Sequence, residues 1–164
     1  VNFSKDCFSN FPNSRVVVFE ANTKLVFACN RSEYGDLLLL NFLVSDEDGK
    51  VEQFNIDYSQ PGISTASKEW MTESRFSKGS QFLTESGGNW AYTSMIPTIT
   101  LDRLIKEYGN PDLIKIDVEG YEFNVISGLT QKSGEICFEW VEEMFEVAEN
   151  SVKHLSSLGY SYPI

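Results

Sequence analysis

Two carboxylates, Asp117 and Glu119, follow an apolar run at residues 112–118 and stand just before Gly120. A nearly continuous apolar run of this length predicts a strand of a parallel sheet covered on both faces. Open α/β sheets bind ligands at the carboxyl ends of such strands. One carboxylate there could contact an ammonium group, and the other could take a proton from a substrate hydroxyl. Asp117 and Glu119 are therefore candidate catalytic residues.

A structural explanation of the same residues has to be weighed against this one. Glu119 could be a negative charge at the N-terminus of a helix over residues 119–127, where the helix dipole favours it. Asp117 could pair with Lys115. For the strand–helix junction taken alone, this explanation is the better one.

Two further acids occupy similar positions. Glu20 ends an apolar run at residues 15–20, where a carboxylate can accept both ribose hydroxyls of a nucleoside cofactor. Glu139 lies near the end of a run at residues 135–141 and would face the same crevice in a parallel sheet. Either acid could instead be a solvated charge at a strand end.

A metal site is not expected. The chain has one histidine and three widely spaced cysteines, which argues against zinc. A divalent ion among Asp117, Glu119 and Glu139 is conceivable, but no sequence feature supports it. We predict no metal.

The elements that must position these acids alternate along the chain. Helices are predicted by apolar spacing and capping residues, and strands by short apolar runs. The pattern predicts an α/β fold with a mainly parallel sheet. The expected helices are 4–11, from Asn22 or Thr23 to about 32, 100–108, 119–127 and 142–158, and the expected strands are 15–20, 37–44, 54–58, 96–99 (an edge strand containing Pro97), 112–118 and 135–141.

Residues 59–95 interrupt this alternation. They are rich in Ser, Thr and Gly, and their aromatic residues show no clean periodicity. Loops of this length in compact domains usually form lids or binding loops. We expect one domain over residues 1–164, with this irregular insert shaping the substrate pocket.

The amino-acid composition of the chain argues against some classes of binding partner. The net charge of −11 argues against nucleic acid and against an anionic membrane surface. No apolar run approaches the roughly 20 residues of a membrane-spanning helix, and no signal peptide opens the chain. The odd, scattered cysteines favour a reducing, cytoplasmic setting.

Several of these segments together resemble the FkbM-type family of S-adenosylmethionine-dependent methyltransferases. Val18 to Asn22 is similar to the family's Phe-Glu-Pro-Asn segment, with Ala21 in place of proline, and residues 43–49 resemble the segment after its next strand. The resemblance covers about residues 15–160. Its most specific part is the run Lys115, Ile116, Asp117, Val118, Glu119, Gly120, Tyr121, Glu122, preceded by Thr100, Leu101, Asp102 and followed by Val125, Ile126, Ser127, Gly128.

The resemblance implies a class I methyltransferase fold, a Rossmann-like three-layer sandwich with S-adenosylmethionine lying across the strand ends. It implies that Glu20, with Asn22, binds the ribose, that Val44 and Ser45 border the adenine, and that Asp117 lies near the methionine portion. It also implies methylation of a hydroxyl on a sugar or similar small metabolite, with Glu119 or Asp117 as the base.

Two alternatives stay open. Glu20 alone fits a nicotinamide-dinucleotide-binding Rossmann domain equally well. The family's first strand and glycine-rich cofactor loop would precede Val1, so we expect an incomplete chain, and strands at the far edge could be missing too. A truncated or non-catalytic interaction domain with weak cofactor binding is the corresponding hypothesis.

Overall fold

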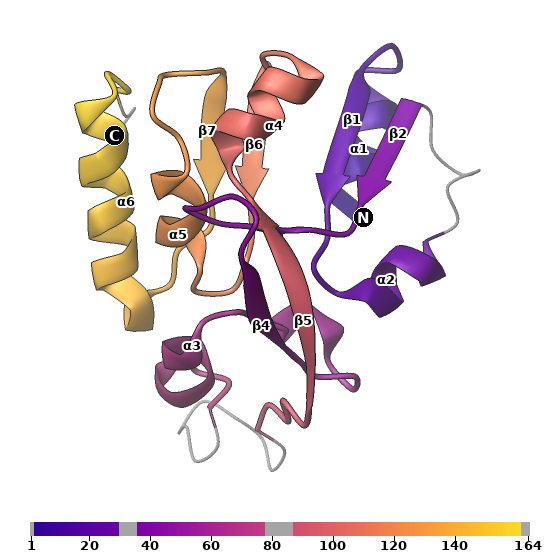
Figure 1. The fold of residues 1–164 in the computed structure, drawn as a ribbon, viewed down its shortest axis with the longest axis vertical. Coiled ribbons are helices and arrows are strands. Elements are labelled where there is room, and N and C mark those ends of the chain that lie inside the picture. Colours follow the sequence, from indigo (N-terminus) through magenta and orange to yellow (C-terminus); the bar gives the residue numbers. More distant parts are fainter. Residues whose placement is uncertain (1, 30–35, 78–86, 162–164) are drawn as a thin grey trace.

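The fold is described by a computed structural model over residues 2–29, 36–77 and 87–161. Helices and strands are mixed, which confirms the α/β class. The described strands form three small sheets in place of one continuous sheet, with orders β1-β2, β3-β5-β4 and β6-β7. Figure 1 shows β1, β2, β6 and β7 running in the same direction, so their carboxyl ends lie on the same side of the molecule.

The N-terminal part carries the first parallel pair. Helix α1 (Asn2–Asn10) precedes β1 (Arg15–Phe19), and β2 (Asp36–Leu40) follows α2 (Thr23–Ala28). Asn22 caps α2 as predicted, because its side chain accepts the backbone N–H of Lys24 at 3.2 Å. The helix is shorter than predicted and ends at Ala28, while the rest of its predicted range, 30–32, lies outside the described residues.

The strand predicted over residues 37–44 is broken in two, which is a correction. The side-chain amide of Asn41 donates to the backbone oxygens of Glu20 and Ala21 at 2.7 and 3.2 Å. These bonds fix the chain at the end of β1, and β3 (Leu43–Val44) then pairs with another sheet. The break therefore depends on contacts about twenty positions away along the chain.

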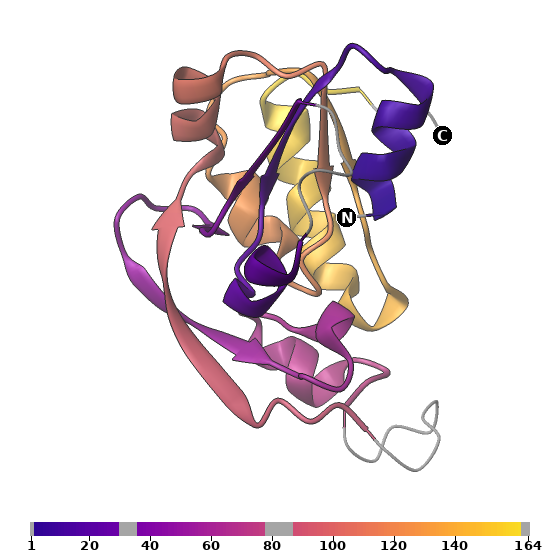
Figure 2. The same ribbon diagram turned by 90° about the vertical axis from the view of Figure 1, so that its right-hand side faces the viewer.

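The strands β4 (Val51–Ile56) and β5 (Tyr92–Ile99) form a long antiparallel pair along one side of the molecule (Figure 2). The short edge strand predicted at residues 96–99 is wrong, because β5 is longer and lies between β3 and β4. Pro97 is tolerated since it pairs with Val51 at the end of the β4 ladder, before the β3 ladder begins at Thr98. The insert contains a 3-10 turn η2 (Pro61–Ile63) and helix α3 (Lys68–Glu73).

The C-terminal part carries the second parallel pair, β6 (Leu113–Ile116) and β7 (Glu135–Phe138), preceded by α4 (Leu101–Tyr108). Thr100 caps α4 as predicted, accepting the N–H of Arg103 at 3.2 Å. Helix α5 (Glu122–Ser127) begins three residues later than predicted, and β7 ends three residues earlier. The last helix opens as a 3-10 turn, η3 (Glu142–Met144), before α6 (Phe145–Ser157).

One apolar core joins these parts. Its buried members come from β3, β4, β5, β6 and from helices α4, α5 and α6, and include Leu43, Phe54, Ile56, Ile96, Ile99, Leu104, Ile116, Val125, Ile126 and Leu155. Helices α5 and α6 pack against each other beside β6 and β7 (Figure 1). Among the described residues, no helix is long and apolar enough to cross a membrane.

Candidate active site

The residues after β6 form a tight turn that separates the strand from α5. Glu119 has a φ of 56° and Gly120 a φ of 83°, both in the left-handed region. The side chain of Glu122 closes the turn, because its Oε1 accepts the N–H groups of Val118 and Gly120 at 3.3 Å each. Glu119 therefore lies outside the helix, and its explanation as a helix N-terminal charge does not hold.

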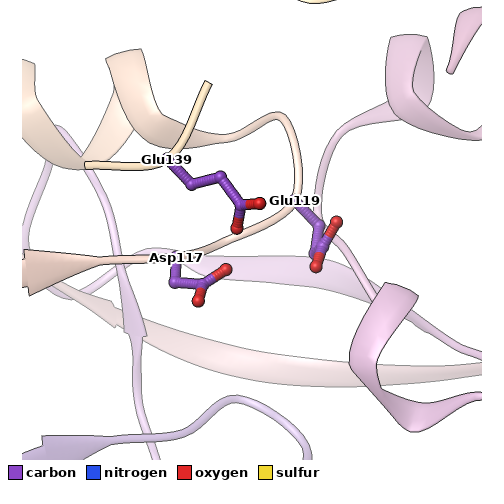
Figure 3. A group of neighbouring side chains, drawn as sticks. All are labelled: Asp117, Glu119 and Glu139. Atoms are coloured by element: carbon purple, nitrogen blue, oxygen red, sulfur yellow. The ribbon is translucent and has the colours of Figure 1, made fainter. Parts of the chain in front are cut away.

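Three carboxylates converge at this turn (Figure 3). Because β6 and β7 are parallel, with Ile116 opposite Phe138, the residues that follow them, Asp117 and Glu139, come side by side. Glu119 joins them from the turn, and one oxygen from each of the three lies within 4.8 Å of the other two. The structure thus brings together both predicted catalytic residues and the acid predicted to share their crevice.

Burial and mutual repulsion change the acidity of this cluster. Burial, followed by the charges of Asp117 and Glu139, raises the pKa of Glu119 to about 8. The pKa of Glu139 is raised first by a hydrogen bond with Asp117, and then by burial. Asp117 also pairs with Lys115, as the structural explanation predicted, at 3.3 Å between Oδ2 and Nζ. A group with this acidity can hold or release a proton near neutral pH.

The same three carboxylates could accommodate a hard cation, since such ions take oxygen ligands. A proton held by Glu119 offsets the same repulsion without an ion. No other feature of the cluster distinguishes a bound cation from a proton on Glu119, so the expectation of no metal stays a prediction.

A narrow pocket adjoins Glu119 and Glu139 between the turn and η3–α6. Its apolar walls include Trp70, Trp140 and Met144. Trp140 is 60% exposed, whereas Trp70 is buried and its indole N–H has no hydrogen-bond acceptor among the residues that the structure describes. The pocket offers an aromatic surface beside the carboxylates.

The predicted ribose ligands lie at the end of β1. Glu20 is half-buried and accepts the N–H of Asn22 at 2.7 Å, and burial raises its pKa. Asn22 itself is buried, with its side chain used to cap α2. Since β1 and β6 run in the same direction, Glu20 and Asp117 both follow carboxyl ends on one side of the molecule (Figure 1). That Glu20 and Asp117 bind the same cofactor remains a prediction.

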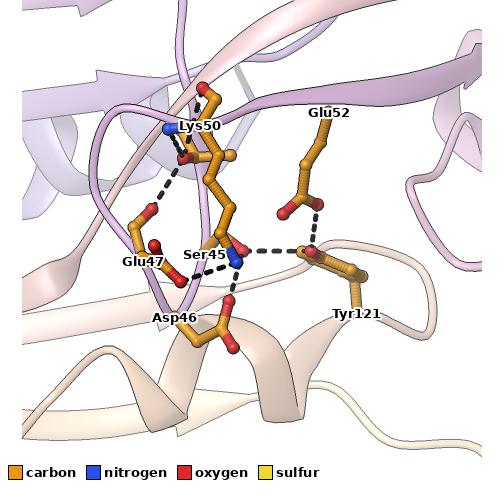
Figure 4. Close-up of polar contacts among 7 residues, drawn as sticks. Ser45, Asp46, Glu47, Lys50, Glu52 and Tyr121 are labelled. Carbon is orange, nitrogen blue, oxygen red and sulfur yellow. Dashed lines mark hydrogen bonds and ion pairs between the residues drawn. The ribbon is translucent and has the colours of Figure 1, made fainter.

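The predicted adenine neighbours lie at the end of β3. Val44 packs against the core, and Ser45 is fully buried. The hydroxyl of Ser45 is 3.0 Å from that of Tyr121 and 3.1 Å from Oδ1 of Asp46 (Figure 4). The Ser45 side chain is therefore engaged inside the protein, and its contact with adenine stays a prediction.

Sequence reasoning missed two contacts to the turn from distant parts of the chain. Thr65 Oγ1 donates to the backbone oxygen of Glu119 at 2.7 Å, and Tyr121 donates to Glu52 Oε2 at 2.6 Å. Both partners come from β4 or the insert that follows it. A threonine in a Ser- and Thr-rich loop carries no signal in the sequence that would have identified it.

Comparison with known proteins gives one clear match. The family model described as "Methyltransferase FkbM domain" matches residues 4–162, nearly the whole chain. No curated protein and no solved structure matches.

Proposed function

Because this chain belongs to the FkbM methyltransferase family, we propose that it transfers a methyl group from S-adenosylmethionine to a hydroxyl of a sugar or similar small metabolite. The observation that carries the proposal is the position of Glu119. Its carboxylate lies beside Asp117 and Glu139 at the carboxyl ends of two parallel strands, next to a pocket with aromatic walls. A hydroxyl placed there has a base within reach.

The residues present fit the cofactor chemically. Glu20 uses one carboxylate oxygen for Asn22, and its second oxygen can accept from a ribose hydroxyl. Asp117 offers an acceptor for an ammonium group. We further propose that the β1-β2 and β6-β7 pairs belong to one cofactor-binding sheet of the class I type, with the described helices packed on its faces. Three free cysteines among the described residues support a cytoplasmic setting.

The bound cofactor supplies a methyl group on a positively charged sulfur. Glu119 would accept the proton that the substrate hydroxyl loses, while the methyl group would pass to the hydroxyl oxygen and the sulfur would keep the bonding electron pair. Burial first, and then the charges of Asp117 and Glu139, keep the pKa of Glu119 high enough for it to take that proton. The apolar walls of the pocket exclude water, which would compete for the methyl group.

Calorimetric titration tests the cofactor class first. We expect S-adenosylhomocysteine to bind and NAD not to bind. Binding of NAD alone would contradict the proposal and favour a dinucleotide-binding domain, and binding of neither would favour a non-catalytic domain.

Transfer of labelled methyl groups to a panel of neutral sugars and other small alcohols then tests the reaction. The kcat/KM should rise with pH up to about 8, because the base works only when ionised. Glu119→Gln should abolish this rise, whereas the exposed Glu142→Gln should not.

A further inference from the structure

A buried threonine of the irregular insert is hydrogen-bonded to the backbone of the candidate base, and we propose that Thr65 is a positioning residue for Glu119. Thr65 lies 54 positions before Glu119, and its hydroxyl donates to the Glu119 backbone oxygen at 2.7 Å. The insert, expected to shape a substrate pocket, would thus also hold the catalytic turn. The catalytic meaning of this role rests on the proposed function.

Glu119 needs support from its surroundings. It is the one non-glycine residue with a positive φ, 56°, among the described residues. L-residues rarely adopt this conformation, and they keep it only where the neighbouring structure holds them. A contact that fixes the peptide group after Glu119 also fixes the direction in which its side chain leaves the backbone.

Thr65 is well placed to supply that contact, because it is itself rigidly held. It is fully buried, and its Oγ1 also accepts the N–H of Ser67 at 2.8 Å. Its backbone N–H and C=O both pair with Asn55 of β4, at 2.9 and 2.8 Å. The Thr65 hydroxyl therefore links the turn to β4 and fixes the position of the turn relative to that strand.

Neighbouring contacts have a different effect. The bonds from Val118 and Gly120 to Glu122 are longer, 3.3 Å, and shape the turn from within. Trp70 packs on Gly120, where a β carbon would lie 3.0 Å from its ring. These contacts keep the turn compact, but neither ties the Glu119 peptide to β4.

The position of Glu119 determines its electrostatic surroundings. The charged groups near its carboxylate are Asp117 and Glu122 on either side of the turn, Glu139 after β7 and Lys115 on β6. If the turn relaxes away from this crevice, both its burial and the repulsion from Asp117 and Glu139 decrease. The pKa of Glu119 should then fall toward the ordinary value of a glutamate.

Three variants separate positioning from stability. Thr65→Val removes the hydroxyl at nearly constant shape, and Thr65→Ser restores it. Thr98→Val is the matched control, because Thr98 is also buried, donates to the Glu47 backbone oxygen at 2.6 Å and accepts the Lys50 N–H at 3.0 Å. The readout is the titration of the Glu119 side-chain carboxyl by ¹³C NMR, assigned with Glu119→Gln.

We expect Thr65→Val to lower the midpoint of the Glu119 carboxyl titration by about one pH unit. In Thr65→Ser and Thr98→Val the midpoint should stay close to that of the wild type. Where methyl transfer is measured, Thr65→Val should lower kcat about tenfold or more without raising the KM for the cofactor. An unchanged midpoint in Thr65→Val, or an equal shift in Thr98→Val, would overturn the proposal.

The NMR titration needs no turnover, so it separates failure of this proposal from failure of the proposed function. If Thr65→Val does not fold, a measurement on the wild-type protein tests the hydrogen bond instead. The Thr65 hydroxyl proton should then exchange slowly enough with water to be observed by NMR, and rapid exchange would contradict the bond to Glu119.

Discussion

The hydroxyl of Tyr121 donates to Oε2 of Glu52 at 2.6 Å, joining the turn after β6 to the β4–β5 hairpin. Ser45 Oγ lies 3.0 Å from the same phenol oxygen (Figure 4). Burial first, and then the bond to Glu52, raises the pKa of Tyr121 above its ordinary value. Tyr121 therefore stays neutral and remains a hydrogen-bond donor across the pH range in which the protein would work.

Tyr121→Phe should lower the free energy of unfolding by about 1–2 kcal/mol, because Glu52 and Ser45 lose a buried partner. A double-mutant cycle with Glu52→Ala, measured by urea unfolding, should give a coupling of about 1 kcal/mol. The exposed pair of Tyr108 and Glu107, 3.2 Å apart, is the matched control and should show almost none. Equal couplings in the two pairs would contradict a structural role for the partly buried bond between Tyr121 and Glu52.

The local parts of the fold could be predicted from the sequence because their causes are local. Asn22 and Thr100 cap their helices by bonds that reach only two or three residues ahead. Parallel pairing of β6 with β7 follows from two short apolar runs joined by a helix. The convergence of Asp117 and Glu139 could be predicted for the same reason, since each follows one of these paired strands.

What could not be predicted depends on distant partners. The split of residues 37–44 into β2 and β3 depends on Asn41 reaching the end of β1. The left-handed conformation of Glu119 is held by Thr65 from the insert and by Glu122. Neither contact leaves a periodic pattern, so the sequence predicts a helix that begins at Glu119, whereas the helix begins at Glu122.

Glu20→Ala should weaken binding of S-adenosylhomocysteine by about 1–3 kcal/mol if its carboxylate accepts ribose hydrogen bonds. Calorimetric titration measures the change. Glu20→Gln is the informative companion, because its amide oxygen can still accept the N–H of Asn22 while the charge is lost. The exposed Glu146→Ala on α6 should leave affinity unchanged. Wild-type affinity in Glu20→Ala would remove Glu20 from the site.

Gly128→Ala should destabilise the protein by about 1–3 kcal/mol or more, because a β carbon there would lie 2.3 Å from the backbone oxygen of Ser45. That oxygen belongs to the buried segment after β3 and cannot move without shifting the Tyr121 contact. Thermal unfolding measures the effect. Gly62→Ala is the control, since nothing lies within 4 Å of its β carbon position. Equal effects of the two substitutions would mean that the close approach at residue 128 is not required.

The raised pKa of Glu119 predicts how stability depends on pH. The folded protein holds this proton up to about pH 8, whereas the unfolded chain releases it near the ordinary glutamate pKa of 4.5. The folded state is thus favoured most below pH 4.5, and this contribution is lost as the pH rises from 4.5 to about 8. Because the side chain is partly exposed, we discount the full shift to about 1–3 kcal/mol. Glu119→Gln, which cannot ionise, should therefore be more stable than wild type by that amount at pH 9 but not at pH 5 in urea unfolding. The exposed Glu142→Gln should show no such difference between the two pH values. If Glu119→Gln differs from wild type in its free energy of unfolding by the same amount at both pH values, burial and the neighbouring charges do not raise the pKa of Glu119.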